Sequence, residues 1–210
     1  MAGLGLIRKM NLMPLLDQIT TALSEAIAAK GAVCMAVSGG SSPVALYQAL
    51  SQVELDWASV TITLIDDRCV PSDHPDSNQR LIKETLLQHK AAAAHFVPLE
   101  AWPEQSIPDI AILGMGGDGH FASLFPAMME RGEGFDPKAE PAILTTEPQG
   151  IPSHPRITMS LSMILAIPFR VLMVIGDEKK DVLAAAQSGQ DFPITRLLAY
   201  DGTTIVTERI

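Results

Sequence analysis

The chain has 210 residues, of which 47% are hydrophobic and 19% are charged. This is enough for one α/β domain over residues 1–210 with a sizeable core. The net charge of −9 argues against nucleic acid as a partner, because nucleic acid requires a positive face. No apolar run approaches the ~18 residues needed to cross a bilayer. The N-terminus lacks a signal-peptide pattern, so we expect a cytoplasmic protein with no membrane partner.

Apolar residues in the first part of the chain recur at helical spacing. Leu15, Ile19 and Leu23 belong to this pattern, and Gly31 follows it as a stop signal. The pattern predicts an amphipathic helix over residues 12–30. Further helices are predicted at 43–52, 77–90 and 178–187.

Four short apolar runs, each followed by a polar or glycine-rich segment, are predicted as strands: 32–37, 60–65, 109–113 and 170–175. Continuous apolar strands that alternate with helices favour a mostly parallel sheet with helices on both faces. Segments 195–200 and 203–208 flank Asp201-Gly202, which predicts a C-terminal hairpin. Residues 126–155 are rich in Pro and Gly, and we expect a long surface excursion there that could cover a site.

A polar motif directly follows each predicted strand. If the strands are parallel, the four motifs meet at one edge of the sheet, where open α/β sheets bind ligands. The motifs are Ser38-Gly39-Gly40-Ser41-Ser42-Pro43, Asp66-Asp67-Arg68, the glycine loop at 114–120, and Gly176-Asp177-Glu178-Lys179.

The first motif offers free amides and hydroxyls at a strand-to-helix turn, a pattern that suits a phosphate group. The alternative is a tight turn capped by Ser42. In the second motif, Arg68 can present a fork of donors to a phosphate or carboxylate. Its alternative is a structural pairing with Asp66 or Asp67, with Asp76 and Ser77 capping the next helix.

Lys179 and Arg156 are further candidate cations for an anionic ligand. Lys179 begins a predicted helix, where a lysine is unfavourable unless an anion lies nearby. It could instead be merely solvated, like Lys180. Whether Arg156 faces the cleft depends on strand register, which the sequence does not fix.

His120 ends the glycine loop, where one imidazole could act as a general base. It could also be a structural histidine. The loop satisfies G-x-G-x-x-G, but Pro126 interrupts the helix that a dinucleotide site requires. The remaining histidines show no metal-ligand spacing along the chain, so we expect no zinc site; they are His74, His89, His95 and His154.

Together these motifs resemble the 6-phosphogluconolactonase family, from about residue 12 to about 208. The specific element is Leu113-Gly114-Met115-Gly116 with Asp118-Gly119-His120, supported by Asp76-Ser77-Asn78 and, more loosely, by Arg156 to Ser160. The resemblance implies a Rossmann-like fold shared with glucosamine-6-phosphate deaminases. It implies no metal or organic cofactor, and hydrolysis of 6-phosphogluconolactone in the pentose phosphate pathway.

By motif, His120 matches the family's base, Arg68 and Lys179 match its basic substrate-binding positions, and Ser38 to Ser42 match its phosphate loop. Asp67 and Gly117 stand where the family usually has Glu, and the segment between Asn78 and Asp109 is shorter than usual. In the expected mechanism His120 takes a proton from the attacking water. Loop amides, that of Gly116 among them, are candidate donors to the carbonyl oxygen. Either Asp118 or Asp66 would orient the imidazole.

Other activities on the same fold remain as alternatives. The deaminase pattern carries Glu five residues after the histidine, where this chain has Phe125, which cannot transfer a proton. A sugar-phosphate isomerase would need another carboxylate, for which Asp66 is the evident candidate. A non-catalytic sugar-phosphate-binding module would not need His120.

Overall fold

The computed structural model describes residues 12–103, 106–132 and 134–208. Its strands are β1 (Val33–Val37), β2 (Val60–Leu64), β3 (Asp66–Arg68), β4 (His95–Phe96), β5 (Ile110–Gly114), β6 (Ile143–Gln149), β7 (His154–Met159), β8 (Phe169–Met173) and β9 (Thr203–Val206). Its α-helices are α1 (Leu12–Lys30), α2 (Val44–Leu50), α3 (Asn78–Thr85), α4 (Pro126–Met129), α5 (Leu161–Ala166), α6 (Asp177–Gln187) and α7 (Pro193–Leu198). Short 3₁₀ turns lie at Trp57–Ser59, His89–Ala93 and Leu99–Ala101.

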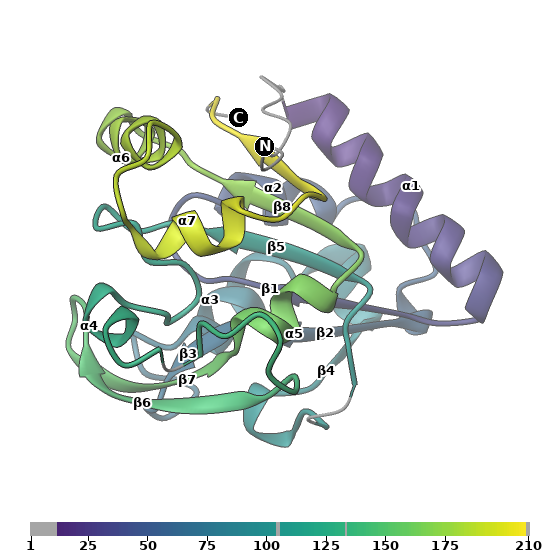
Figure 1. Ribbon diagram of the computed structural model, residues 1–210. Coiled ribbons are helices and arrows are strands. Elements are labelled where there is room, and N and C mark those ends of the chain that lie inside the picture. The colour runs from purple at the N-terminus through teal and green to yellow at the C-terminus, as the bar shows by residue number, and fades with distance from the viewer. Residues whose placement is uncertain (1–11, 104–105, 133, 209–210) are drawn as a thin grey trace.

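The central sheet of the described chain has the order β4-β2-β1-β5-β8-β9, and every pairing in it is parallel. The chain first steps outward from β1 to β2 and β4, then returns to β5 and continues outward to β8 and β9. Crossovers in these two directions place helices on both faces of the sheet (Figure 1). This confirms the predicted parallel sheet and helix 12–30.

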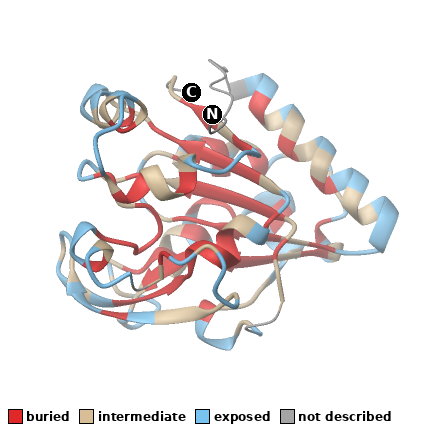
Figure 2. Cartoon of the chain, in the orientation of Figure 1, coloured by how far each residue is buried: buried red, intermediate tan, exposed pale blue. Residues whose placement is uncertain are grey.

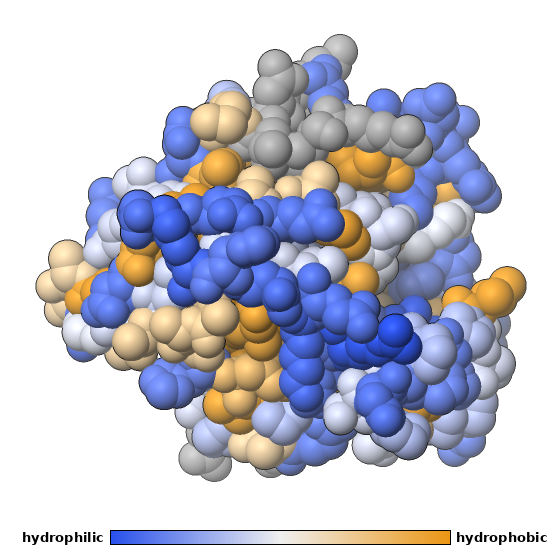
Figure 3. All heavy atoms as spheres, turned by 180° about the vertical axis from the view of Figure 1, so that it is seen from behind, coloured by the Kyte–Doolittle hydropathy of each residue, from blue (hydrophilic) through white to orange (hydrophobic). Residues whose placement is uncertain are grey.

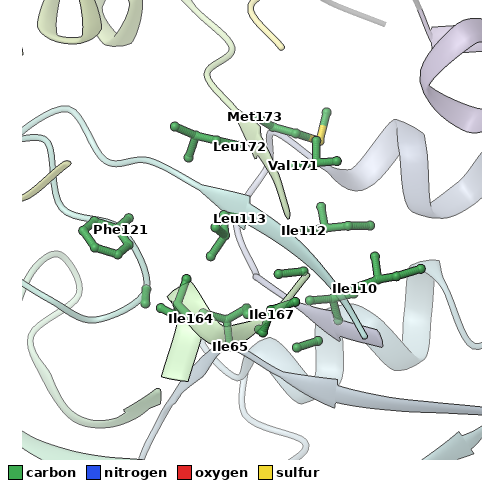
Figure 4. Packing of buried hydrophobic residues seen from close by; sticks show 14 of the residues in the cluster. Ile65, Ile110, Ile112, Leu113, Phe121, Ile164, Ile167, Val171, Leu172 and Met173 are labelled. Carbon is green, nitrogen blue, oxygen red and sulfur yellow. The ribbon is translucent and has the colours of Figure 1, made fainter. Parts of the chain in front are cut away.

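The core lies on the faces of the central strands. All but the last residue of β5 is buried, as expected for a strand covered on both sides. Figure 4 shows Ile112 and Leu113 of β5 beside Val171 and Leu172 of β8, with Ile164 of α5 packed below them. In Figure 2 the strands of this sheet form a continuous buried layer, and exposed residues gather on the outer helices and loops.

A second, three-stranded antiparallel sheet has the order β3-β7-β6. It replaces much of the surface excursion expected at 126–155, because residues 143–149 pair with β7 as β6. Ile65 joins the two sheets. Its N–H donates to the carbonyl of Val37 at 3.0 Å, and its carbonyl accepts from the N–H of Met159 at 2.9 Å.

The predicted C-terminal hairpin is wrong. Residues 193–198 form helix α7, which begins at Pro193, and β9 pairs in parallel with β8. Pro at the first helical position favours a helix start, and burial of Ile194 and Leu197 against the core rewards helical spacing. Asp201-Gly202 is a bend that leads into β9, and the backbone of β9 pairs with the edge strand β8 and not with residues 195–200.

The face in Figure 3 is hydrophilic over much of its area, with hydrophobic residues in scattered groups. Among the described residues, the exposed large hydrophobic side chains are Met13, Ile151 and Tyr200. None of the described helices combines the length and the apolar character that crossing a membrane requires.

Arg170 is a buried cation that ties β8 to its neighbours. Its guanidinium donates to the carbonyls of Leu165 at 2.9 Å, Ile167 at 2.5 Å and Asp201 at 2.5 Å, and to the hydroxyl of Thr203 at 3.2 Å. Burial lowers the pKa of Arg170. The side chain therefore satisfies carbonyl groups at the C-terminal end of α5 and in the segment just before β9.

We predict that Arg170→Met lowers the free energy of unfolding by about 3 kcal/mol or more, because each buried carbonyl left without a donor costs about 1–3 kcal/mol. Urea denaturation measures the loss. Arg80→Met is the matched control, since Arg80 is an exposed partner of Glu84 and such pairs contribute about 0–1 kcal/mol. A loss at Arg170 as small as that of the control would contradict this account.

Candidate active site

A cavity of about 250 Å³ opens at the carboxyl ends of β1 and β5. These adjacent strands are where the chain reverses its direction of travel across the sheet, the usual ligand position in open α/β folds. All four predicted motifs contribute to the lining: Ser38, Gly39, Gly40, Ser41, Ser42, Asp66, Arg68, Gly116, His120, Arg156 and Lys179, with Asn78, Gly114, Met115, Ala122 and Ile151.

The loop after β1 is packed tightly against α3. A Cβ on Gly39 would lie 1.9 Å from Oδ1 of Asn78, so only glycine permits this approach. Ser38 is buried, and its Oγ has no hydrogen-bond partner within the described chain. Ser42 does not cap α2, whose N-cap is Pro43 with no side-chain cap bond. Its hydroxyl oxygen instead accepts a hydrogen bond from Nζ of Lys179 at 3.4 Å.

Lys179 reaches the cavity from the first turn of α6. Burial lowers the pKa of its ammonium group, and the nearby charge of Glu178 partly offsets this effect. Its contact with Ser42 joins the loop after β1 to the loop after β8. A desolvated ammonium group beside a hydroxyl is suited to an anionic ligand group.

Arg68 is not neutralised by its neighbouring aspartates. Within the described ranges no ion pair joins it to a carboxylate; its guanidinium donates to Oδ1 of Asn78, and its Nε has no partner. Asn78 in turn donates to the carbonyl of Asp66 at 2.7 Å. Arg68 is thus positioned by an amide and keeps its charge available.

Asp67 has a structural role here. Its carboxylate accepts from the N–H groups of Arg68 at 2.7 Å, Asn78 at 2.6 Å and Gln79 at 3.0 Å. Burial raises its pKa, and these amide bonds oppose that effect. Ser77 caps α3 by accepting from the N–H of Arg80 at 3.3 Å, so this part of the capping alternative is confirmed.

Arg156 lies opposite Arg68 in the pairing of β7 with β3, and it faces the cavity. It is 3% exposed, donates to the carbonyl of Pro152 at 3.2 Å, and stacks 5.2 Å from the ring centre of Phe125. Its Nε has no partner in the described part of the chain. Burial lowers its pKa, and the charge of Arg68 lowers it further. Two neighbouring guanidinium groups with unpaired N–H atoms are suited to binding an anion.

His120 is held by its own loop. Its Nδ1 lies 2.5 Å from Oδ1 of Asp118, and its N–H donates to the same oxygen at 3.2 Å. Burial would raise the pKa of Asp118, but its hydrogen bonds and attraction to His120 outweigh burial and lower it. Asp66, the other candidate to orient the imidazole, instead accepts from the hydroxyl of Ser123 at 2.5 Å.

Gly116 makes room for the imidazole. A Cβ there would lie 2.2 Å from Cε1 of His120. The N–H of Gly116 already donates to the carbonyl of His120 at 2.8 Å, so it is not free to stabilise a substrate oxygen as expected. Glycine is needed at this position in the cavity because a side chain would occupy the space of the His120 ring.

Phe125 packs against the imidazole. It is 2% exposed, with ring centres 4.5 Å apart and planes tilted by 37°. Sequence reasoning placed Asn78 in a motif but gave it no role at the site, because a polar residue after Ser77 looks like a helix start. It missed Ile151, which lies 31 residues after His120 in a loop.

The family model described as glucosamine-6-phosphate isomerases/6-phosphogluconolactonase matches residues 9–107 and 91–206 of this sequence. This chain belongs to that family. It is 39% identical over 207 residues to 6-phosphogluconolactonase of Neisseria meningitidis, covering 90% of this chain and 89% of that protein. It is also 39% identical over 203 residues to 6-phosphogluconolactonase of Rhizobium meliloti, covering 88% and 87%.

Solved structures of family members share the architecture. The crystal structure of a 6-phosphogluconolactonase from Shewanella baltica superposes with a TM-score of 0.85 at 32% identity, over 99% of this chain and 98% of that one. A monomeric glucosamine-6-phosphate deaminase is 19% identical with a TM-score of 0.73, which shows the common fold alone. The fold therefore does not separate the two chemistries, and the side chains of the site must.

Proposed function

We propose that this chain hydrolyses 6-phosphogluconolactone to 6-phosphogluconate. The observation that carries the proposal is that His120, which is paired with Asp118, lines the same cavity as three cations, Arg68, Arg156 and Lys179. Hydrolysis of a phosphorylated lactone requires a general base that activates water and positively charged groups that bind the phosphate. Its close relatives carry the name of this activity.

The phosphate binds among the cations. Arg68 and Arg156 are fixed by Asn78 and by the Phe125 ring, respectively, and neither has its charge neutralised by an ion pair in the described chain. Amides of the Gly39–Ser42 loop and the ammonium group of Lys179 complete this binding site. Anchoring the phosphate positions the lactone carbonyl for attack and replaces a bimolecular encounter by a local one.

His120 acts as the base. Because Nδ1–H is directed to Asp118, the lone pair of Nε2 is left for a water molecule. The water loses its proton to Nε2 as its oxygen attacks the carbonyl carbon. The tetrahedral intermediate collapses with cleavage of the ring C–O bond, and protonated His120 returns the proton to the leaving ring oxygen. Asp118 fixes the tautomer and stabilises the imidazolium.

Phe125 disfavours the deaminase alternative. It occupies the position where the deaminase pattern has a proton-transferring Glu, and its ring is packed between His120 and Arg156. The remaining carboxylate of the cavity, Asp66, is engaged by Ser123. Neither group is placed to add a second acid-base residue beside the imidazole.

The test of the function is hydrolysis of freshly prepared 6-phosphogluconolactone, followed by acid release above the spontaneous rate. Unphosphorylated gluconolactone serves as the comparison, and we expect it to be a much poorer substrate. Ammonia release from glucosamine 6-phosphate at a comparable rate would overturn the proposal, as would a lactone rate equal to the spontaneous one.

We predict that His120→Ala lowers kcat by about 10²–10⁴-fold, the usual contribution of one general acid-base group. Asp118→Asn should cause a smaller loss, because the imidazole remains but its orientation and charge partner weaken. Full turnover by a folded His120→Ala protein, checked by circular dichroism, would refute this role.

We predict that Arg68→Met and Lys179→Met weaken binding of the phosphorylated lactone by about ten- to 150-fold. This corresponds to about 1.5–3 kcal/mol for one charge-assisted contact. Unphosphorylated gluconolactone should be little affected. Lys180→Met is the control, because Lys180 neighbours Lys179 but pairs with Asp177 at 3.5 Å on the surface. Equal losses on both lactones would show that these cations do not recognise phosphate.

A further inference from the structure

Three potential metal ligands meet just outside the residues that line the cavity. Nε2 of His154 lies 2.8 Å from Oδ2 of Asp76, and Nδ1 of His74 lies 3.7 Å from the same oxygen. One donor atom from each residue falls within 4.8 Å of the others. The two imidazole rings meet edge to face with their centres 5.8 Å apart. The expectation of no zinc site rested on local histidine spacing, which does not indicate this cluster because 80 positions separate the two histidines.

The backbone holds these ligands in place. His74 and Asp76 belong to the loop between β3 and α3, and His154 is the first residue of β7. The N–H of Cys69 donates to the carbonyl of Pro155 at 2.9 Å, which fastens the loop to β7. Within the loop, the N–H of Ser77 donates to the carbonyl of His74 at 3.0 Å. The cluster therefore joins two segments that are already fixed next to each other.

The local charge tolerates a cation despite the neighbouring arginines. Arg68 and Arg156 contribute two positive charges, while Asp66, Asp67 and Asp76 contribute three formal negative charges around Arg156. One formal negative charge is thus left over.

We propose that His74, Asp76 and His154 form a binding site for one zinc-like divalent cation. Two imidazoles and one carboxylate are a ligand set typical of Zn²⁺, with water in the fourth position. Ligands about 2.1 Å from a tetrahedral ion lie about 3.4 Å from one another. The separations of 2.8 and 3.7 Å lie on either side of this value, and no pair of donor atoms is more than 4.8 Å apart, so side-chain rotations can bring the three ligands to the required spacing.

Binding exchanges two existing contacts. Nδ1 of His74 now accepts from the backbone N–H of Asp76 at 3.1 Å, so this nitrogen carries a lone pair and lies next to the cluster's carboxylate. The metal takes that lone pair, and it also replaces the hydrogen bond between His154 and Asp76. Mg²⁺ should not compete, because it prefers an octahedral set of oxygen ligands.

The test is calorimetric titration of Zn²⁺ into untagged protein that has been treated with a chelator and dialysed. We expect one ion per chain and a rise of the melting temperature with zinc. Loss of a residue that only hydrogen-bonds a metal ligand typically weakens metal binding by about 10–100-fold. His154→Gln and His74→Gln each remove a ligand itself, so each should weaken zinc binding by more than this. Asp76→Asn should do the same, which keeps the test decisive if one histidine variant does not fold.

His95→Gln is the matched control, because His95 is an exposed histidine of β4 outside the cluster. It should bind zinc like the original chain, and excess Mg²⁺ should leave the titration unchanged. The proposal is overturned if no stoichiometric binding occurs, if the cluster variants bind normally, or if only His120→Ala loses binding. If only His120→Ala loses binding, the ion binds at the His120–Asp118 pair. If no stoichiometric binding occurs, the cluster is only a hydrogen-bonded contact between the loop and β7.

Discussion

The backbone of Ile65 is the constraint on which the site depends. Its N–H belongs to the parallel sheet and its carbonyl to the antiparallel one, so the chain crosses from one sheet to the other within a single residue. The following strand, β3, carries Arg68 and pairs with β7, which carries Arg156. Without this crossing, the parallel sheet would present its loops to open solvent on that side. With it, Arg68 and Arg156 line the cavity opposite the loops after β1 and β5.

The same pairing organises the histidine loop. The N–H of Ser123 donates to the hydroxyl of Thr158 on β7 at 3.1 Å, and its own hydroxyl donates to Asp66 on β3. The segment just after His120 is therefore anchored to both strands that hold the arginines. The distance between His120 and the cations is thus set by hydrogen bonds between buried groups, and less by the intrinsic stiffness of a glycine-rich loop.

Several features of this molecule could be predicted from local sequence. Four apolar strands with polar motifs behind them indicated a parallel sheet and a site at one edge, and the cavity brings those motifs together. The C-terminal hairpin was wrong because apolar residues 194 and 197 fit a helix or a strand, and only burial against the core decides between them. Strand β6 was missed because much of it is solvent-exposed and lacks an apolar run. Whether Arg156 faces the cavity depends on the register between β3 and β7. Register is set by the pairing of the two strands, so it cannot be predicted from the sequence of either strand alone.

The register of β7 also determines how relatives of this chain can differ in length. Side chains alternate between the two faces of a strand, so inserting or deleting one residue between Arg156 and Met159 would turn the guanidinium away from the cavity. The turn between β6 and β7 carries no such restriction: the ladder is already irregular between Thr146 and Gln149, and Ile151 is 97% exposed. Length variation among relatives should therefore accumulate at this turn, beside the mouth of the cavity. There it can reshape access to the cavity without moving the charged side chains that line it.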